Sequence, residues 1–154
     1  MSFDDLVKSF GEQIGVPLRV DDTGTCALAV RDMALTLQDV PELDSIGLWG
    51  VIGEPPPQGL ERLLSAMLEA NHMFGGTAGA TISRDPESGR FFLCRLLDAR
   101  CLDADALATA LEKFINTLES WVVLVKDYRE SESSAAAVEP EAVSDFNANG
   151  FLAV

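Results

Sequence analysis

The chain has 154 residues, of which 25 are Asp or Glu and 11 are Lys or Arg, so its formal net charge is −14. This length fits one domain with an appendage, and an apolar content of 47% is enough for a buried core. Because a polyanion repels phosphate backbones and anionic lipid headgroups, we expect neither nucleic acid nor a membrane surface as a partner.

The cysteines and the N-terminus predict the compartment. Cys26, Cys94 and Cys101 form no CxxC pair, and an odd, scattered set is typical of a reducing environment. The stretch Met1–Asp5 carries acid where a signal peptide needs base. No apolar run approaches the roughly 20 residues of a membrane span. We therefore expect a cytoplasmic protein.

The first predicted element is a short amphipathic helix. Ser2 and Asp5 have the spacing of a capping box. Gly15 followed by Pro17 is a typical helix end. The apolar residues between these signals recur at helical spacing: Phe3, Leu6, Val7, Phe10 and Ile14.

Strand signals follow this helix. Leu18–Val20 is a brief apolar stretch, and Asp21–Gly24 has the composition of a turn. Cys26–Arg31 and Met33–Gln38 alternate strictly between apolar and small or polar residues. This period of two predicts antiparallel strands with one buried face, and Ile46–Ile52 predicts another strand.

A proline run, Pro55–Pro57, separates these strands from a second amphipathic helix that starts at Leu60 and ends before Gly75. Ala78–Ser83 and Phe91–Leu97 flank a polar turn and predict a hairpin. The second of these strands is apolar on both faces. We therefore expect both of its faces to be covered, one of them by a second subunit.

The last predicted helix begins after Asp103, which has the chemistry of an N-cap. Its segment Trp121–Val125 is apolar all round, which is more than one core face requires. From Glu130 onward the acids face no Lys or Arg. We therefore predict one domain over residues 1–129 and an acidic, flexible tail over residues 130–154. The apolar end of that tail either docks elsewhere or is a frayed terminus.

No catalytic constellation emerges from the sequence. The lone His72 has no sequence partner that would make it a base, and one His with three separated Cys does not form a zinc site. Gly75–Gly79 follows a helix and enters a strand, which is the reverse of a phosphate loop. The acidic pairs lack a calcium-loop pattern. We expect no enzyme activity, no metal and no cofactor.

The element order and several stretches resemble the Tir chaperone (CesT) family of type III secretion chaperones. Phe3–Leu18 resembles the first helix of the family and its exit. Cys26–Arg31 and Met33–Gln38 resemble its early sheet, and Leu60–Phe74 resembles its central helix. A hairpin before a long last helix also matches, whereas the proline run and the tail are not features that the family requires.

The resemblance implies an α+β fold: three helices and a twisted antiparallel sheet of about five to six strands, forming a homodimer. In such a dimer the central helix and its neighbouring sheet make the contact. The residues expected there are Leu60, Leu63, Leu64, Met67, Leu68, Phe91 and Leu93.

The resemblance also implies a secreted effector protein as the partner, whose N-terminal segment lies extended on apolar patches of the first helix and early sheet. The candidates for this contact are Phe3, Val7, Phe10, Leu18, Val20, Leu28, Val30, Leu35 and Leu37. Plain core packing is the competing interpretation of each residue. The competing functions are a regulatory adaptor that binds a folded partner and a small enzyme with an unrecognised site.

Overall fold

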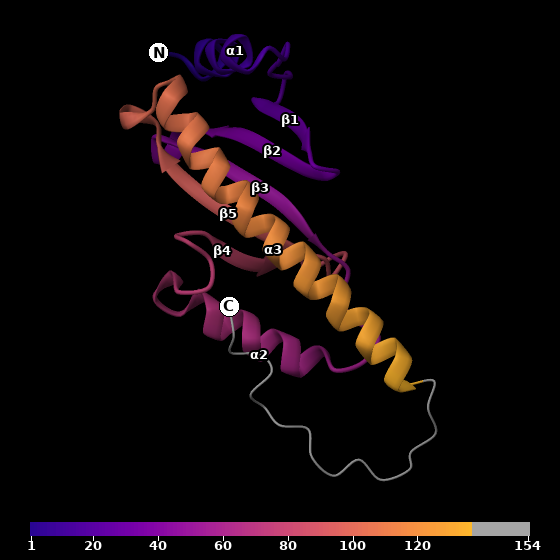
Figure 1. Cartoon of the computed structure of the whole chain (residues 1–154). Helices are drawn as coiled ribbons and strands as arrows, with labels where there is room; N and C mark the ends of the chain where they lie inside the picture. The colour runs from indigo at the N-terminus through magenta and orange to yellow at the C-terminus, as the bar shows by residue number, and fades with distance from the viewer. Residues whose placement is uncertain (137–154) are drawn as a thin grey trace.

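The computed structural model describes residues 1–136, and the predicted tail beyond them lies outside the described residues. Figure 1 shows how the helices are arranged around the sheet. The elements in chain order are α1 (Phe3–Ile14), β1 (Thr25–Val30), β2 (Met33–Val40), β3 (Ser45–Gly53), α2 (Leu60–Asn71), β4 (Thr81–Arg84), β5 (Phe91–Asp98) and α3 (Ala104–Ala136).

The five strands form one antiparallel sheet in the order β1-β2-β3-β5-β4. This confirms the α+β class and the antiparallel sheet that the sequence predicts. The helix α3 crosses one face of the sheet, while α1 and α2 lie at its opposite edges, beside β1 and β4 (Figure 1). The two edge strands therefore have different neighbours.

The first helix begins and ends as the sequence predicts. The Ser2 hydroxyl accepts the Asp5 backbone N–H at 3.1 Å, and the Asp5 carboxylate accepts from Ser2 in return. Gly15 ends the helix in the left-handed conformation, with φ of 71°. The following stretch Leu18–Val20, predicted as a short strand, is not a strand in the structure. It returns beside α1, where a Cβ atom at Gly11 would lie 3.2 Å from the backbone N of Leu18.

The β1–β2 hairpin turns on two residues, Arg31 and Asp32, both with positive φ (49° and 63°). This is the signature of a type I′ turn, whose twist matches that of the strands it joins. Neither residue is glycine, so the turn carries some backbone strain. The side chain of Arg31 makes a long-range contact with Glu119 of α3.

The last helix packs closely on the middle of the sheet at a glycine. A Cβ atom at Gly50 of β3 would lie 2.4 Å from Cδ2 of Leu118, so a larger residue there would force the Leu118 side chain to shift. The predicted cap is present, since the Asp103 carboxylate accepts the Ala106 N–H at 2.8 Å. The helix continues to Ala136, and the first residues that the sequence assigns to the tail are therefore helical.

The far half of α3 also holds the chain segments on either side of α2. The Trp121 indole N–H donates to the Gly76 carbonyl at 2.9 Å, and the Tyr128 hydroxyl donates to the Gly59 carbonyl at 2.7 Å. These contacts explain part of the apolar excess around Trp121. One side of the helix covers the sheet, and its neighbouring surface anchors the α2 segment.

Candidate functional site

The strand β5 has two apolar faces, as the sequence predicts, but only one lies beneath α3. Phe91 and Leu93 are fully buried in the core on the helix-covered face. The alternate residues Phe92 and Cys94 are half-buried on the other face, and Leu96 is 52% exposed there. The dimer residues expected on this strand, Phe91 and Leu93, therefore already pack within the subunit.

The neighbouring strand β3 extends this second face. Register pairs Trp49 with Cys94 and Val51 with Phe92, so these side chains share one side of the sheet. We call this surface the open sheet face and define it by Trp49, Val51, Phe92, Cys94 and Leu96. The Trp49 ring lies across Gly47, where a Cβ atom would be 1.9 Å from the ring. A shallow pocket on this face is lined in part by Trp49, Cys94 and Leu96.

The other expected dimer residues lie on α2 and differ in their exposure. Leu63 and Met67 point into the core, whereas Leu60 and Leu64 are half-buried against it. Leu68 is 70% exposed. The α2 surface that is available to another molecule therefore centres on Leu68.

The turn after α2 continues this exposed apolar surface. Met73 and Phe74 are both exposed, and both have left-handed backbone conformations, with φ of 52° and 58°. Left-handed φ is uncommon for such residues and marks local strain, which clusters at functional positions. The sequence signalled only a helix stop here, because the exposure of this turn depends on how α2 docks.

The residues expected to contact an effector also divide into two groups. Val7 and Phe10 of α1 and Leu35 and Leu37 of β2 are buried in the core of the single subunit. The remaining residues are partly buried at its border: Phe3, Leu18, Val20, Leu28 and Val30. Only this border set is in reach of another chain without opening the core.

Beside α1 the border includes a groove with a mostly apolar lining. It runs between the helix and the returning chain, with Lys8 and Glu12 on one side and Val16–Leu18 on the other. A Cβ atom at Gly11 would lie 2.6 Å from the Val16 carbonyl oxygen, so glycine allows the two segments to approach. Ile14 and Val16 are exposed nearby. The groove therefore adds apolar surface next to β1.

The outer edge of β1 carries free main-chain groups. The Asp39 N–H donates to the Gly24 carbonyl, and hydrogen-bonded pairs alternate along an antiparallel ladder. Ala27 and Ala29 therefore direct their N–H and C=O groups away from β2. The Asp21 turn binds both outward groups of Thr25. Within residues 1–136 no hydrogen bond reaches the outward groups of Ala27 and Ala29.

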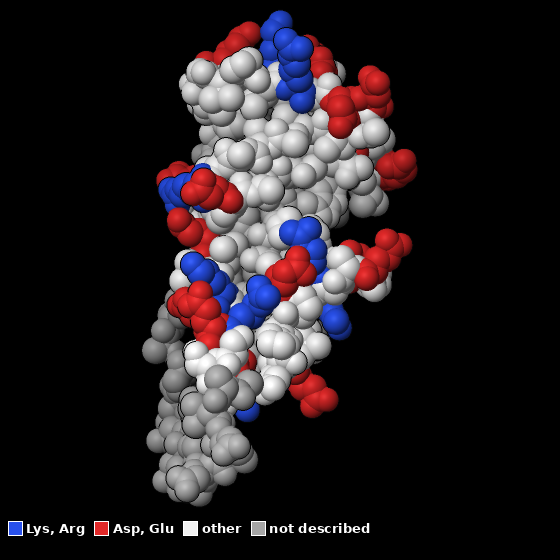
Figure 2. Space-filling view, turned by 90° about the vertical axis from the view of Figure 1, so that its right-hand side faces the viewer, with Lys and Arg blue, Asp and Glu red and all other residues white. Residues whose placement is uncertain are grey.

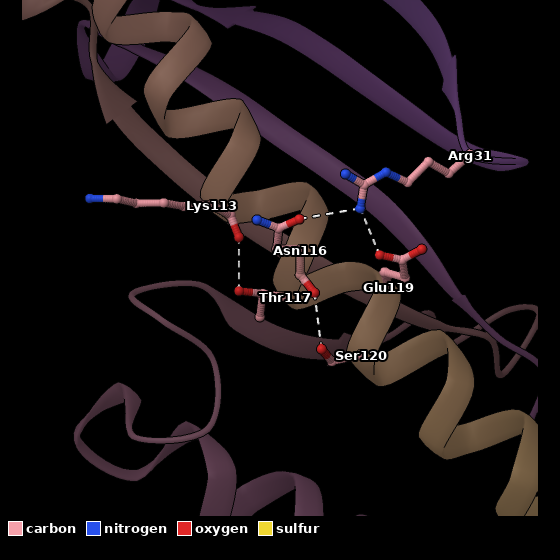
Figure 3. Close-up of polar contacts among 6 residues, drawn as sticks. All are labelled: Arg31, Lys113, Asn116, Thr117, Glu119 and Ser120. Carbon is pink, nitrogen blue, oxygen red and sulfur yellow. Dashed lines mark hydrogen bonds and ion pairs between the residues drawn. The ribbon is translucent and has the colours of Figure 1, made fainter.

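An ion pair ties the tip of the β1–β2 hairpin to α3 (Figure 3). The Arg31 guanidinium donates to Glu119 at 2.7 Å and to the Asn116 side chain at 3.2 Å. Thr117 and Ser120 next to them donate their hydroxyls back to helix carbonyls, so they do not compete for Arg31. Both charged partners are about half exposed, and the pair therefore orients the hairpin more than it stabilises it.

The titratable groups of residues 1–136 include two thiols with a raised pKa and one exposed histidine. Burial raises the pKa of the Cys26 and Cys94 thiols, which keeps both protonated. His72 is exposed at the end of α2. Across residues 1–136 no cluster of three or more His, Cys, Asp or Glu side chains is placed to hold a metal ion. In the same part of the chain no helix has the length and apolarity needed to cross a bilayer.

The surface charge follows the composition. Figure 2 shows acidic side chains along the outline of the molecule, with an uncharged stretch between them in the upper half of the view. Basic side chains lower in that view are interspersed with acids. Among the described residues, the Arg90 guanidinium lies 2.9 Å from the Glu54 carboxylate. The face in this view therefore presents uncharged surface bordered by acidic side chains.

Comparison with known proteins identifies the family to which the chain belongs. The model of the Tir chaperone protein (CesT) family matches residues 5–122. The chain therefore belongs to this family, which confirms the resemblance predicted from its sequence. No curated protein sequence matches the chain.

Solved structures share the fold. One chain of the HopA1–SchA chaperone–effector complex is 22% identical with a TM-score of 0.62, covering 83% of this chain and 93% of that one. One chain of the ExsC–ExsE complex is 21% identical with a TM-score of 0.67, covering 79% and 92%. One chain of the heterodimeric ExoU–SpcU complex from the type III secretion system of Pseudomonas aeruginosa is 18% identical with a TM-score of 0.61, covering 82% and 99%.

Proposed function

We propose that this protein is a homodimeric type III secretion chaperone of the bacterial cytoplasm. It holds the N-terminal segment of a secreted effector in extended form and keeps that effector soluble and competent for secretion. The observation that carries the proposal is the free edge of β1, where Ala27 and Ala29 offer main-chain groups beside a border of apolar side chains. Similarity to chaperone–effector complexes supports it.

The β1 edge suits an unfolded partner. An added strand satisfies the outward groups of Ala27 and Ala29, while side chains of the border set give selectivity. In this proposal Leu28, Val30 and Leu18 contact the effector directly. The buried residues Val7, Phe10, Leu35 and Leu37 support that surface from below. Ordering the segment costs entropy, which offsets part of the contact energy and permits release.

In the same proposal a second copy of the chain covers the open sheet face. An apolar surface built around Trp49, Phe92 and Leu96 is a liability for a free subunit, and an isologous contact removes it from water. Exposed Leu68 and half-buried Leu60 and Leu64 extend the contact onto α2. Leu63, Met67, Phe91 and Leu93 act through the core that positions these side chains.

The net charge of −14 has a role in this function. Two subunits carry twice that charge, and mutual repulsion keeps loaded dimers apart in solution. The charge also favours basic stretches in the bound segment, since long-range attraction raises the rate of encounter.

The test is to recover the bound partner. The tagged protein is purified from its native host, the complex is digested with a protease, and the protected fragment is identified by mass spectrometry. We expect an N-terminal fragment of a secreted protein. Recovery of an intact, folded regulator would contradict the proposal and favour the adaptor function.

A matched pair of variants links that result to the β1 edge. Ala27→Pro removes one outward N–H and leaves the ladder to β2 intact, because proline is tolerated where the N–H faces away from the partner strand. Ala27→Thr keeps the N–H. We expect the proline variant to lose the protected fragment and the threonine variant to retain it. Equal protection in both variants would exclude strand addition at β1.

A further inference from the structure

The second edge of the sheet is closed by a side chain. The strand β4 pairs with β5 through Ile82 and Leu93, and the main-chain groups of Ile82 point away from β5. Asn71, the last residue of α2, binds both of them. The Ile82 N–H donates to Oδ1 of Asn71 at 2.8 Å, and Nδ2 of Asn71 donates to the Ile82 carbonyl at 3.1 Å. The carboxamide thus replaces one residue of a neighbouring strand.

Local structure occupies one more position of this short edge, since the Ala80 N–H donates to the Thr77 carbonyl at 3.0 Å. The Asp85 N–H donates to the Arg90 carbonyl at 2.9 Å within the β4–β5 hairpin, so Arg84 is the outward position that follows Ile82. Ile82 lies between Ala80 and Arg84, and its side chain is buried in the core. The Asn71 carboxamide therefore occupies the central place at which an incoming strand would pair with β4.

Asparagine fits both partners at this position, because its carboxamide carries one acceptor and one donor group. An aspartate presents two acceptors, of which one faces the Ile82 carbonyl, and an alanine reaches neither group. The backbone of Asn71 is ordinary right-handed helix, with φ of −68° and ψ of −23°, so the helix itself does not require asparagine. The requirement comes from the strand edge.

We propose that Asn71 is the residue that confines strand addition to β1. With the centre of the β4 edge occupied, two successive free outward positions, Ala27 and Ala29, remain on β1, and a partner strand binds there. Without Asn71 the sheet has two open edges, and copies of the chain pair edge to edge without closure. This inference rests on the proposed function only in naming the β1 edge as the place where the partner binds.

The test compares Asn71→Ala, Asn71→Asp and, as a surface control on α3, Asn116→Ala. Amide hydrogen exchange at Ile82 is measured together with the average mass by sedimentation at increasing protein concentration. We expect exchange at Ile82 to rise about tenfold in Asn71→Ala, because a lost hydrogen bond frees this amide for local opening. We also expect its mass to rise continuously with concentration.

Asn71→Asp separates edge closure from a purely structural role. Its carboxylate still accepts the Ile82 N–H, and its charge opposes edge-to-edge pairing. We expect exchange at Ile82 to stay slower than in Asn71→Ala, because the acceptor of its N–H is kept, and we expect the mass of the unmodified protein, as in Asn116→Ala. A constant mass in Asn71→Ala, with or without faster exchange, would overturn the inference. None of these outcomes depends on the effector, so failure here leaves the proposed function standing.

Discussion

The two faces of the sheet are built from the same strands, but α3 covers only one of them. On β5 the buried Phe91 and Leu93 alternate with the half-buried Phe92 and the exposed Leu96. The first pair is covered by α3 of its own subunit, whereas the second belongs to the open sheet face. The difference teaches that apolar character alone does not tell which face a protein reserves for another molecule.

A glycine marks the closest approach of α3 to the face that it covers. Gly50 of β3 lets Leu118 approach the sheet on one side. On the other side Gly47 is covered by the ring of Trp49, a neighbour on the same strand. The covered face thus packs against a helix, while the opposite face is filled by its own side chains and remains shallow. The following predictions test this contrast.

The largest effect is expected on the covered face. Leu93→Ala leaves a cavity beneath α3, and we expect the free energy of unfolding to fall by about 3 kcal/mol. Leu96→Ala is the matched control on the open sheet face of the same strand. Urea denaturation at several protein concentrations measures both. The loss in Leu93→Ala should be the same at every concentration, and equal losses in the two variants would refute the contrast between the faces.

A charge on the open sheet face should act on association instead of folding. Leu96→Glu places an unpaired carboxylate in the proposed contact between two copies. We expect the dimer to weaken by about 2 kcal/mol, about thirtyfold in dissociation constant. Sedimentation should then find the mass shifting toward one subunit, 16.6 kDa, while circular dichroism stays unchanged. An undisturbed dimer would place the contact elsewhere.

The period of two in the sequence correctly identified β1 and β2, and the polar turn before Phe91 correctly identified the hairpin that contains β5. The sequence also showed that β5 is apolar on both faces. It gave no means of deciding which face the last helix covers, because that depends on how segments far apart in the chain pack together. The residues expected in the dimer from β5 were for this reason Phe91 and Leu93, which the structure places in the core.

The thiols offer a milder probe of the same contrast. We expect Cys101, which is exposed, to react first with iodoacetamide at pH 8, and Cys94 and Cys26 to react slowly. Burial raises the pKa of both slow thiols, and the thiolate is the reactive form. The raised pKa values also contribute stability that is lost as pH rises above the ordinary thiol range. Mass spectrometry of the labelled peptides gives the order, and a fast Cys94 would contradict this description of the open sheet face.

The smallest expected effect is on the stability of the fold at low pH. Hydrogen bonds from the Arg100 side chain and backbone lower the pKa of Asp98 to about 2. A lowered pKa means that this pair contributes stability above the unfolded pKa of about 3.9, and that the contribution is lost as pH falls toward 2. Asp98→Asn should therefore flatten the acid limb of the stability curve slightly. Unfolding by acid, followed by fluorescence, measures this difference. Identical unfolding curves for the variant and the unmodified protein would show that the Asp98–Arg100 pair does not contribute to acid stability.

The contact of Asn71 with the edge of β4 could not be predicted from the sequence, because it joins two separate elements. Asn71 stands at a helix end, where a polar residue needs no special explanation. Its role appears only when Ile82, from the next strand, is placed beside it. The capping box at Ser2 and the cap at Asp103 were predictable, in contrast, because both partners of each contact lie within three residues.

The most direct measurement is amide hydrogen exchange on the protein with and without its protease-resistant effector fragment. The account predicts that the amides of Ala27 and Ala29 exchange at least about tenfold more slowly in the complex, as those of a newly paired strand do. The Ile82 amide should stay unchanged. Unprotected amides at Ala27 and Ala29 in a saturated complex would contradict the claim that the partner joins the sheet at β1.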